Sequence, residues 1–96
     1  MEGLTIFTFD VPEEKQAEYL KVTSEKIKPF WESHGCQSYD IFQATEGSPA
    51  FLKTMFLADM SAIQMGADMS EEAKSIVQIF NSYATNVSVK TYVKKT

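Results

Sequence analysis

The stretch "HGCQSYDIFQATEGSPAFLKTMFLADMSA", residues 34–62, decides the fold. It holds two β-rich runs, at residues 36–44 and 50–58, with the turn-forming cluster Glu-Gly-Ser-Pro between them. Two strand-like runs around a Gly/Pro cluster are typical of an antiparallel hairpin. The stretch is therefore predicted to form two neighbouring antiparallel strands, and the Asp-Met-Ser that follows them is predicted to begin a helix.

The side chains of the first predicted strand fall into two sets. Alternation places Tyr39, Ile41 and Gln43 on one face of the sheet. The opposite face receives Cys36, Ser38, Asp40 and Phe42. Because polar Ser38 and Asp40 would be costly to bury against helices, we expect their face to lie away from the helices. Tyr39 is then expected to face the helices and any cavity beneath them.

The elements before the hairpin follow from their periodicity. A β-branched and aromatic run at residues 4–9 predicts a strand. Pro12 suits the first turn of a helix, whose apolar residues then recur every three or four positions. Pro29 is expected to bend this helix or to begin a new final turn, and Gly35 is expected to end it.

A second helical region lies beyond the hairpin. It is predicted to break at Gly66 and to resume as a better helix capped by Ser70, before a last strand at residues 87–93. The resulting order is strand, helix, strand, strand, helix, strand, which is that of the ferredoxin-like split unit. We therefore expect an α+β fold with a four-stranded antiparallel sheet, two helices on one face, and a single domain over residues 1–96.

The composition argues against several classes of function. The 96-residue chain has a net charge of −4, and its nine basic residues are all lysines, whereas nucleic-acid binders present a basic surface with arginine forks. No apolar run approaches the roughly 20 residues of a membrane span. The first residues lack the basic start and apolar stretch of a signal peptide, and the lone Cys36 cannot form an internal disulfide. We expect a cytoplasmic protein without nucleic-acid or membrane partners.

Both faces of the predicted sheet are apolar. In the first strand Leu4 and Ile6 lie on one side and Phe7 and Phe9 on the other, and the third strand repeats this pattern. Two helices cover only one face, and an exposed apolar patch of this size is a liability for a monomer. A homodimer is therefore expected, with two sheets packed face to face and the first-strand and third-strand aromatic residues near the seam.

Two stretches of the sequence resemble a known family. The run GCQSYDIFQATEGSPAFLKTMFLADMSAIQMG at residues 35–66 and the later VKTYV are similar to the antibiotic-biosynthesis monooxygenase-like family of the dimeric α+β barrel superfamily. The similarity rests on Gly35 and Cys36, on Tyr39, and on the Asp-x-x-Ala helix start at residues 59–62. It implies a dimeric barrel. Relatives include haem-degrading enzymes, cofactor-independent quinone-forming oxygenases, and members with no known activity.

The sequence departs from this family at positions that haem binding requires. Family members often carry a Trp at the end of the third strand, where Leu57 stands, and a His in the second helix, where spacing places Gly66. Haem-degrading relatives also use an Asn early in the first strand, and residues 4–9 contain none. Together with the missing metal-ligand spacing, these departures lead us to expect no haem, no other cofactor and no metal.

Two residues are candidates for catalysis if the protein is an enzyme. Tyr39 is suited to orient or deprotonate a phenolic substrate, and His34 is the only histidine, whose side chain ordinarily titrates near neutrality. A helix cap is the simpler explanation of His34, which lies beside Gly35. The residues predicted to line a ligand cavity are Trp31, Phe56, Met65, Met69, Tyr83 and Tyr92. Plain core packing is the alternative for the tryptophan and the methionines.

Two classes of function remain open. The first is a cofactor-independent oxygenase that acts on a small apolar or aromatic compound in a cavity within each subunit. The alternative is a non-catalytic module of the same fold that binds a small ligand or serves assembly, because one scaffold hosts many activities. An enclosed cavity with Tyr or His tips that point into it favours the enzyme, whereas a filled interior favours the module.

Overall fold

The computed structural model of the protein describes residues 2–59 and 70–96. The strands in this part of the chain are β1 (Gly3–Asp10), β2 (Cys36–Gln43), β3 (Phe51–Leu57) and β4 (Thr85–Val93). They form one antiparallel sheet in the order β2-β3-β1-β4. The predicted hairpin and the predicted ferredoxin-like α+β fold are both confirmed.

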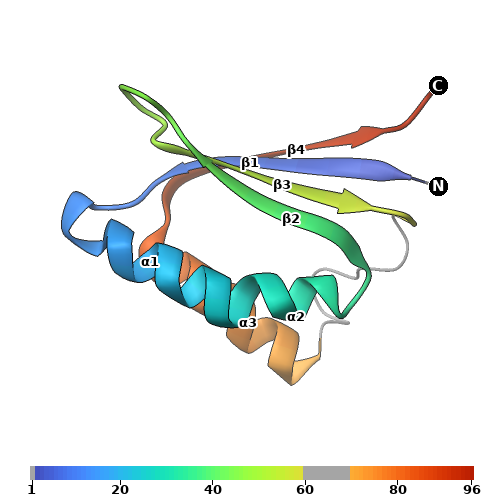
Figure 1. Ribbon diagram of the computed structural model, residues 1–96, viewed down its shortest axis with the longest axis horizontal. Coiled ribbons are helices and arrows are strands. Elements are labelled where there is room, and N and C mark those ends of the chain that lie inside the picture. The colour runs from blue at the N-terminus through green and yellow to red at the C-terminus, as the bar shows by residue number, and fades with distance from the viewer. Residues whose placement is uncertain (1, 60–69) are drawn as a thin grey trace.

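The helices cover one face of the sheet (Figure 1). The first helical segment begins with a 3-10 turn, η1 (Glu13–Lys15), and continues as α1 (Gln16–Val22). It then widens into a π-turn, η2 (Thr23–Ile27), and ends as α2 (Lys28–Glu32). The second helix, α3 (Glu71–Tyr83), lies beside it. Within the described residues, no helix has the length and apolar character that crossing a membrane requires.

The π-turn η2 is explained by the proline that follows it. The amide of Lys28 donates to the carbonyl of Thr23, five residues earlier. Pro29 has no amide hydrogen, and its ring crowds the carbonyl four residues before it, so a wider turn relieves the clash. Pro29 then occupies the first positions of α2, which confirms the expectation that it begins a new final turn.

Helix α3 begins as its sequence predicts. The Ser70 side chain accepts a hydrogen bond from the Ala73 amide at 3.1 Å, and Glu71 and Glu72 lie in the first turn, at the positive end of the helix dipole. Its buried residues are Ala73, Ile76 and Phe80. The short helical piece predicted before Gly66 falls mainly outside the described residues.

The strand register separates two faces of the sheet. The side chains of β3 that point toward the helices are Phe51, Lys53, Met55 and Leu57, and each of them is buried. Tyr39 pairs with Met55 and is fully buried on the same side, so its predicted orientation toward the helices is confirmed. The opposite face, called the open face below, carries Leu4, Ile6, Phe42, Leu52, Phe56 and Tyr92.

Two expectations about the sheet are wrong. Cys36 was expected to share a face with Ser38, but the register shifts between these two residues, so Cys36 lies buried on the helix side with 2% exposure. A bulge adds one residue to a strand and therefore reverses the alternation beyond it. The aromatic residues of β1 were expected near a dimer seam, but Phe7 and Phe9 pack edge-on against Phe80 of α3.

The centre of the core is a cluster of aromatic rings. The ring of Phe9 stacks on that of Phe51 with centroids 5.7 Å apart, and meets the rings of Phe80 and Tyr19 edge-on at 5.0 and 5.7 Å. Offset-stacked and edge-on pairs are the geometries that aromatic quadrupoles favour. These contacts fasten α1 and α3 to the two central strands.

Asp10 holds one end of the sheet together. Its carboxylate accepts hydrogen bonds from the Ser48 hydroxyl at 2.8 Å, the Ala50 amide at 2.8 Å and the Asn86 amide group at 3.2 Å. These bonds, that from Ser48 most of all, hold the pKa of Asp10 below its ordinary value. The end of β1 is thereby tied to the β2–β3 turn and to the start of β4.

Candidate functional site

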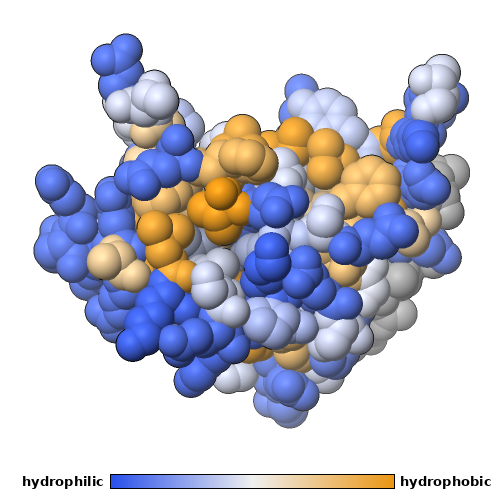
Figure 2. All heavy atoms as spheres, viewed as in Figure 1, coloured by the Kyte–Doolittle hydropathy of each residue, from blue (hydrophilic) through white to orange (hydrophobic). Residues whose placement is uncertain are grey.

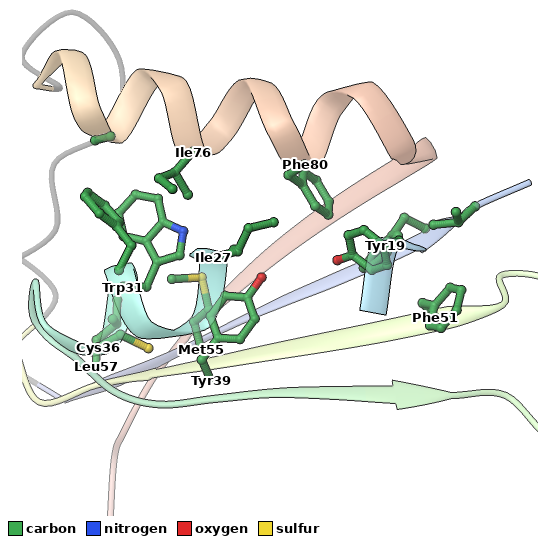
Figure 3. Packing of buried hydrophobic residues seen from close by; sticks show 14 residues of the cluster. Tyr19, Ile27, Trp31, Cys36, Tyr39, Phe51, Met55, Leu57, Ile76 and Phe80 are labelled. Atoms are coloured by element: carbon green, nitrogen blue, oxygen red, sulfur yellow. The ribbon is translucent and has the colours of Figure 1, made fainter. Parts of the chain in front are cut away.

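A cavity of about 190 Å³ lies between the sheet and the helices. Its walls include Ile27 and Trp31 from the first helical segment and Ile76 and Phe80 from α3. Figure 3 shows these side chains pointing toward one another across the space above Met55. The lining is apolar apart from Lys53 and Asn81. Such a cavity, mostly apolar with few polar groups, has the character of a small-molecule site.

The cavity has a mouth beside β4. Val87 and Val89 of this strand line it, and they are 40% and 55% exposed. Each residue of β4 is exposed. A small molecule therefore has a route from solvent past these valines to the interior.

Lys53 is the unusual residue of the cavity. It lies on the central strand β3 and is only 3% exposed, whereas lysine is almost never fully buried without a partner. Its Nζ sits 3.9 Å from the ring centroid of Phe7 and 3.8 Å from that of Phe80. Among the described residues, no hydrogen bond or ion pair to this amine is formed. Burial lowers the pKa of Lys53 to about 7.

Lys53 was not among the site residues predicted from the sequence, although a signal for it was present. In the run FLKTMFL, Lys53 shares a face with Phe51, Met55 and Leu57 by simple alternation. A lysine in the middle of an apolar face is either a buried functional group or a sign that the face is exposed. The neighbours of Lys53 on this face are buried, which indicates a buried functional group.

Tyr39 lies next to the cavity in a cluster of buried hydroxyl groups. Its ring centroid is 5.4 Å from Nζ of Lys53. The hydroxyls of Tyr39, Tyr19 and Thr23 are buried, and none makes a hydrogen bond of good geometry within the described residues. Burial raises the pKa of Tyr19 to about 12 and raises that of Tyr39 further. Tyr39 is therefore protonated at neutral pH, where it can donate a hydrogen bond but cannot act as a base.

His34 is placed as a cap at the end of α2. Its Nδ1 lies 2.7 Å from the carbonyl oxygen of Phe30 and 2.8 Å from the Ser33 hydroxyl, and its ring stacks on that of Phe30 at 4.1 Å between centroids. These contacts fix the histidine at the helix end, and it is not among the residues that line the cavity. The structure does not bring His34 and Tyr39 together in one site.

The residues predicted to line the cavity lie in different parts of the structure. Trp31 lines the cavity, but Phe56 and Tyr92 lie on the open face, on the other side of the sheet. Tyr83 packs against the ring of Tyr19 and donates from its hydroxyl to Glu18 at 2.7 Å, also outside the cavity. Met65 and Met69 lie outside the described residues.

Two further features of the region bear on its chemistry. The Cys36 thiol donates to the carbonyl of Ser38 at 2.9 Å, and burial raises its pKa, so it is poorly suited to act as a thiolate nucleophile. Within residues 2–59 and 70–96, no three His, Cys, Asp or Glu side chains gather to hold a metal ion.

Solved structures resemble the whole chain. SnoaB, a cofactor-independent oxygenase from Streptomyces nogalater, superposes with a TM-score of 0.78 at 13% identity, over 99% of this chain and 94% of that one. An antibiotic biosynthesis monooxygenase superposes with a TM-score of 0.72 at 15% identity, over 100% of both chains. The fold is that of the antibiotic biosynthesis monooxygenases. A conserved protein from Methanosarcina mazei also shares it, with a TM-score of 0.75 and 18% identity over 99% and 94% of the two chains.

This monooxygenase fold confirms the resemblance drawn from the sequence at the level of structure. No family model matches the sequence, and no curated protein matches it, so the likeness rests on three-dimensional structure. Leu57, which stands where family members often carry a tryptophan, is buried at the end of β3. The position of the family's histidine, Gly66, lies outside the described residues.

Proposed function

We propose that the protein is a cofactor-independent oxygenase that acts on a small acidic aromatic compound bound in the cavity. The observation that carries this proposal is the amine of Lys53 within an otherwise almost wholly apolar cavity. With a pKa of about 7, this amine is partly neutral at physiological pH and can accept a proton. General bases are most effective when their pKa lies near the working pH.

The size of the cavity restricts the substrate. An engineered protein cavity of about 150 Å³ binds benzene, and the cavity here measures about 190 Å³. The substrate is therefore a compound of one aromatic ring or two fused rings. Its hydroxyl group points toward Lys53, while the ring packs among Ile27, Trp31 and Phe80.

The chemistry needs only the substrate, oxygen and the base. Lys53 takes the proton of a phenol, and the resulting ammonium stabilises the anion beside it. The electron-rich ring then reduces O₂. One oxygen atom enters the ring carbon opposite the hydroxyl and the other leaves as water, so that a naphthol plus O₂ gives a naphthoquinone plus water.

Oxygen uptake with a phenolic probe tests the proposal. With 1-naphthol as the probe, the protein is expected to consume dissolved oxygen, and Lys53→Met is expected to lower the rate by about 10²-fold or more, the usual contribution of a general base. The rate should rise as the pH passes through about 7, where the amine loses its proton. Naphthalene, which lacks the acidic hydroxyl, should not be consumed.

The control for this experiment is Lys74→Met, because Lys74 lies on the outer surface of α3, paired with Glu71 at 3.6 Å. This variant should retain the full rate. Binding of 1-naphthol without any oxygen uptake would contradict the proposal and leave the alternative, a module that binds a small ligand without catalysis.

We also propose that the protein acts as a homodimer through the open face. Apolar residues from all the strands described gather there, and Figure 2 shows hydrophobic residues along the sheet in the upper part of the molecule, above a largely hydrophilic helical part. Phe42 and Tyr92 on this face are 56% and 44% exposed. A patch of this kind on a small protein is characteristic of an interface.

Light scattering tests the dimer. At micromolar concentration the measured mass should be about twice the chain mass of 10.8 kDa. Ile6→Lys places a charge in the centre of the open face and should give monomers, since an unpaired buried charge is strongly unfavourable. Leu20→Lys, at a 37% exposed position on α1, should leave the dimer intact. A monomer from the unaltered chain would refute this assembly.

A further inference from the structure

We propose that Lys53 is a nucleophile that condenses with small aromatic aldehydes or ketones entering the cavity, and that it holds them as imines. This activity goes beyond the proposed oxygenase because it needs no oxygen. Three observations carry it: the position of the amine inside the cavity, the burial that leaves the amine partly uncharged near neutral pH, and the open route from solvent.

The amine is placed where a bound carbonyl compound would lie. Lys53 lines the cavity together with Phe7 and Phe80, and its Nζ lies within 3.9 Å of the ring centroid of each. A bound benzaldehyde ring fits the volume of about 190 Å³, given that about 150 Å³ suffices for benzene. Apolar walls hold the ring, so the carbonyl carbon is presented to the polar group beside it.

Burial favours the neutral form of the amine, against the attraction of the Phe7 and Phe80 ring faces for its charged form. The titratable groups that act on Lys53 are Cys36 and Tyr39 of β2, and burial raises the pKa of both, so they are uncharged near neutral pH. The first helical segment, α3, β1 and β4 contribute only uncharged side chains to the cavity around it. Lysines in apolar pockets become nucleophilic for this reason, since only the neutral amine has a free electron pair.

The condensation balances without any additional reactant. The nitrogen lone pair attacks the carbonyl carbon, the C–N bond forms, and the π electrons of the carbonyl move to its oxygen. A proton passes from nitrogen to that oxygen to give a carbinolamine. Loss of the hydroxyl as water then leaves the imine, so that amine plus aldehyde gives imine plus water. The water leaves by the mouth beside Val87 and Val89.

Reductive trapping tests this inference on the intact protein. The protein is mixed with benzaldehyde near neutral pH without oxygen, the imine is reduced with sodium borohydride, and the adduct is located by peptide mass mapping. The chain contains nine lysines, so the others serve as internal controls. Lys53 is expected to be labelled roughly ten-fold faster or more than any of them, because the neutral amine is the nucleophile and burial favours that form at Lys53.

Two controls keep the result interpretable. Toluene, which occupies the cavity but has no carbonyl, should slow the labelling of Lys53 in the unaltered protein, and so this control does not depend on how any variant folds. Lys53→Met should remove the fast adduct, while Lys74→Met should retain it. Labelling spread evenly over the lysines, or a Lys53 rate that toluene leaves unchanged, would overturn the inference.

The trapping experiment and the naphthol assay test the imine and the oxygenase separately. Trapping at Lys53 without oxygen uptake in the naphthol assay would support a carbonyl site and reject the oxygenase. Oxygen uptake without trapping would support the base role of the amine and reject the imine.

Discussion

Replacing Lys53 with methionine is expected to stabilise the fold by about 2 to 4 kcal/mol near pH 6. At that pH the folded protein holds a largely protonated amine in an apolar interior, which is costly. Methionine has a similar length and is apolar, so it fills the same space between Phe7 and Phe80 without that cost. The free energy of unfolding from urea titrations measures the difference.

The pH dependence of this effect has a definite sign. The unfolded chain keeps the Lys53 proton up to its ordinary pKa of 10.5, whereas the folded chain releases it at about 7. Between these values the unfolded state binds more protons, so stability rises with pH, by up to about 1.4 kcal/mol per pH unit. The buried tyrosines, with raised pKa values, act in the opposite direction only above about pH 10.

Stability of the unaltered protein should therefore rise by about 2 kcal/mol from pH 7 to pH 9, whereas that of Lys53→Met should change much less. Lys74→Met, on the surface of α3, is the matched control and should follow the unaltered protein. Parallel curves for the protein and Lys53→Met would show that the amine keeps its proton in the folded state. The base role and the imine would then both lose their physical basis.

Phe9→Ala is expected to be the most destabilising of the substitutions considered, costing about 3 to 5 kcal/mol. Phe9 is fully buried and makes ring contacts with Phe51, Phe80 and Tyr19. Alanine would leave a void among elements that cannot all move to fill it, because the ring joins both central strands to α1 and α3. Chemical denaturation followed by near-ultraviolet circular dichroism reports the loss.

The size of this effect is large for a small domain, whose total stability is typically roughly 5 to 15 kcal/mol. Phe9→Leu keeps most of the volume and should cost distinctly less. Leu20→Ala, at a partly exposed position of α1, provides the surface comparison and should cost under about 1 kcal/mol. An effect of Phe9→Ala no larger than that of Leu20→Ala would mean that the aromatic cluster is not the centre of the core.

The fold could be predicted because its signals are local. The turn around Gly47 and the runs on either side of it are sufficient to define the hairpin, and Ser70 with Glu71 and Glu72 defines the start of α3. Proline at position 29 and glycine at position 35 mark the last turn of the first helical segment and its end. Each of these signals depends on backbone geometry that a few neighbouring residues determine.

The site could be predicted only in part because its signals are not local. Alternation predicted the orientation of Tyr39 correctly. It assigned Cys36 to the wrong face, because no sequence signal indicates the register shift before Ser38. Phe56 was assigned to the cavity because alternation divides a strand into two faces without saying which face meets the helices. Lys53, at the third position of β3, becomes important only when Phe7 and Phe80 are brought to it from distant parts of the chain.

The π-turn η2 (Thr23–Ile27) makes the cavity wall sensitive to the length of the chain. A π-turn contains one residue more than the α-turn it replaces, and one residue of an α-helix corresponds to a rotation of about 100° and a rise of about 1.5 Å. Deleting a single residue here would turn Trp31 away from the side of the helix on which Tyr19 packs. Pro29 stabilises the extra residue of this turn, so the shape of the cavity depends on that one residue.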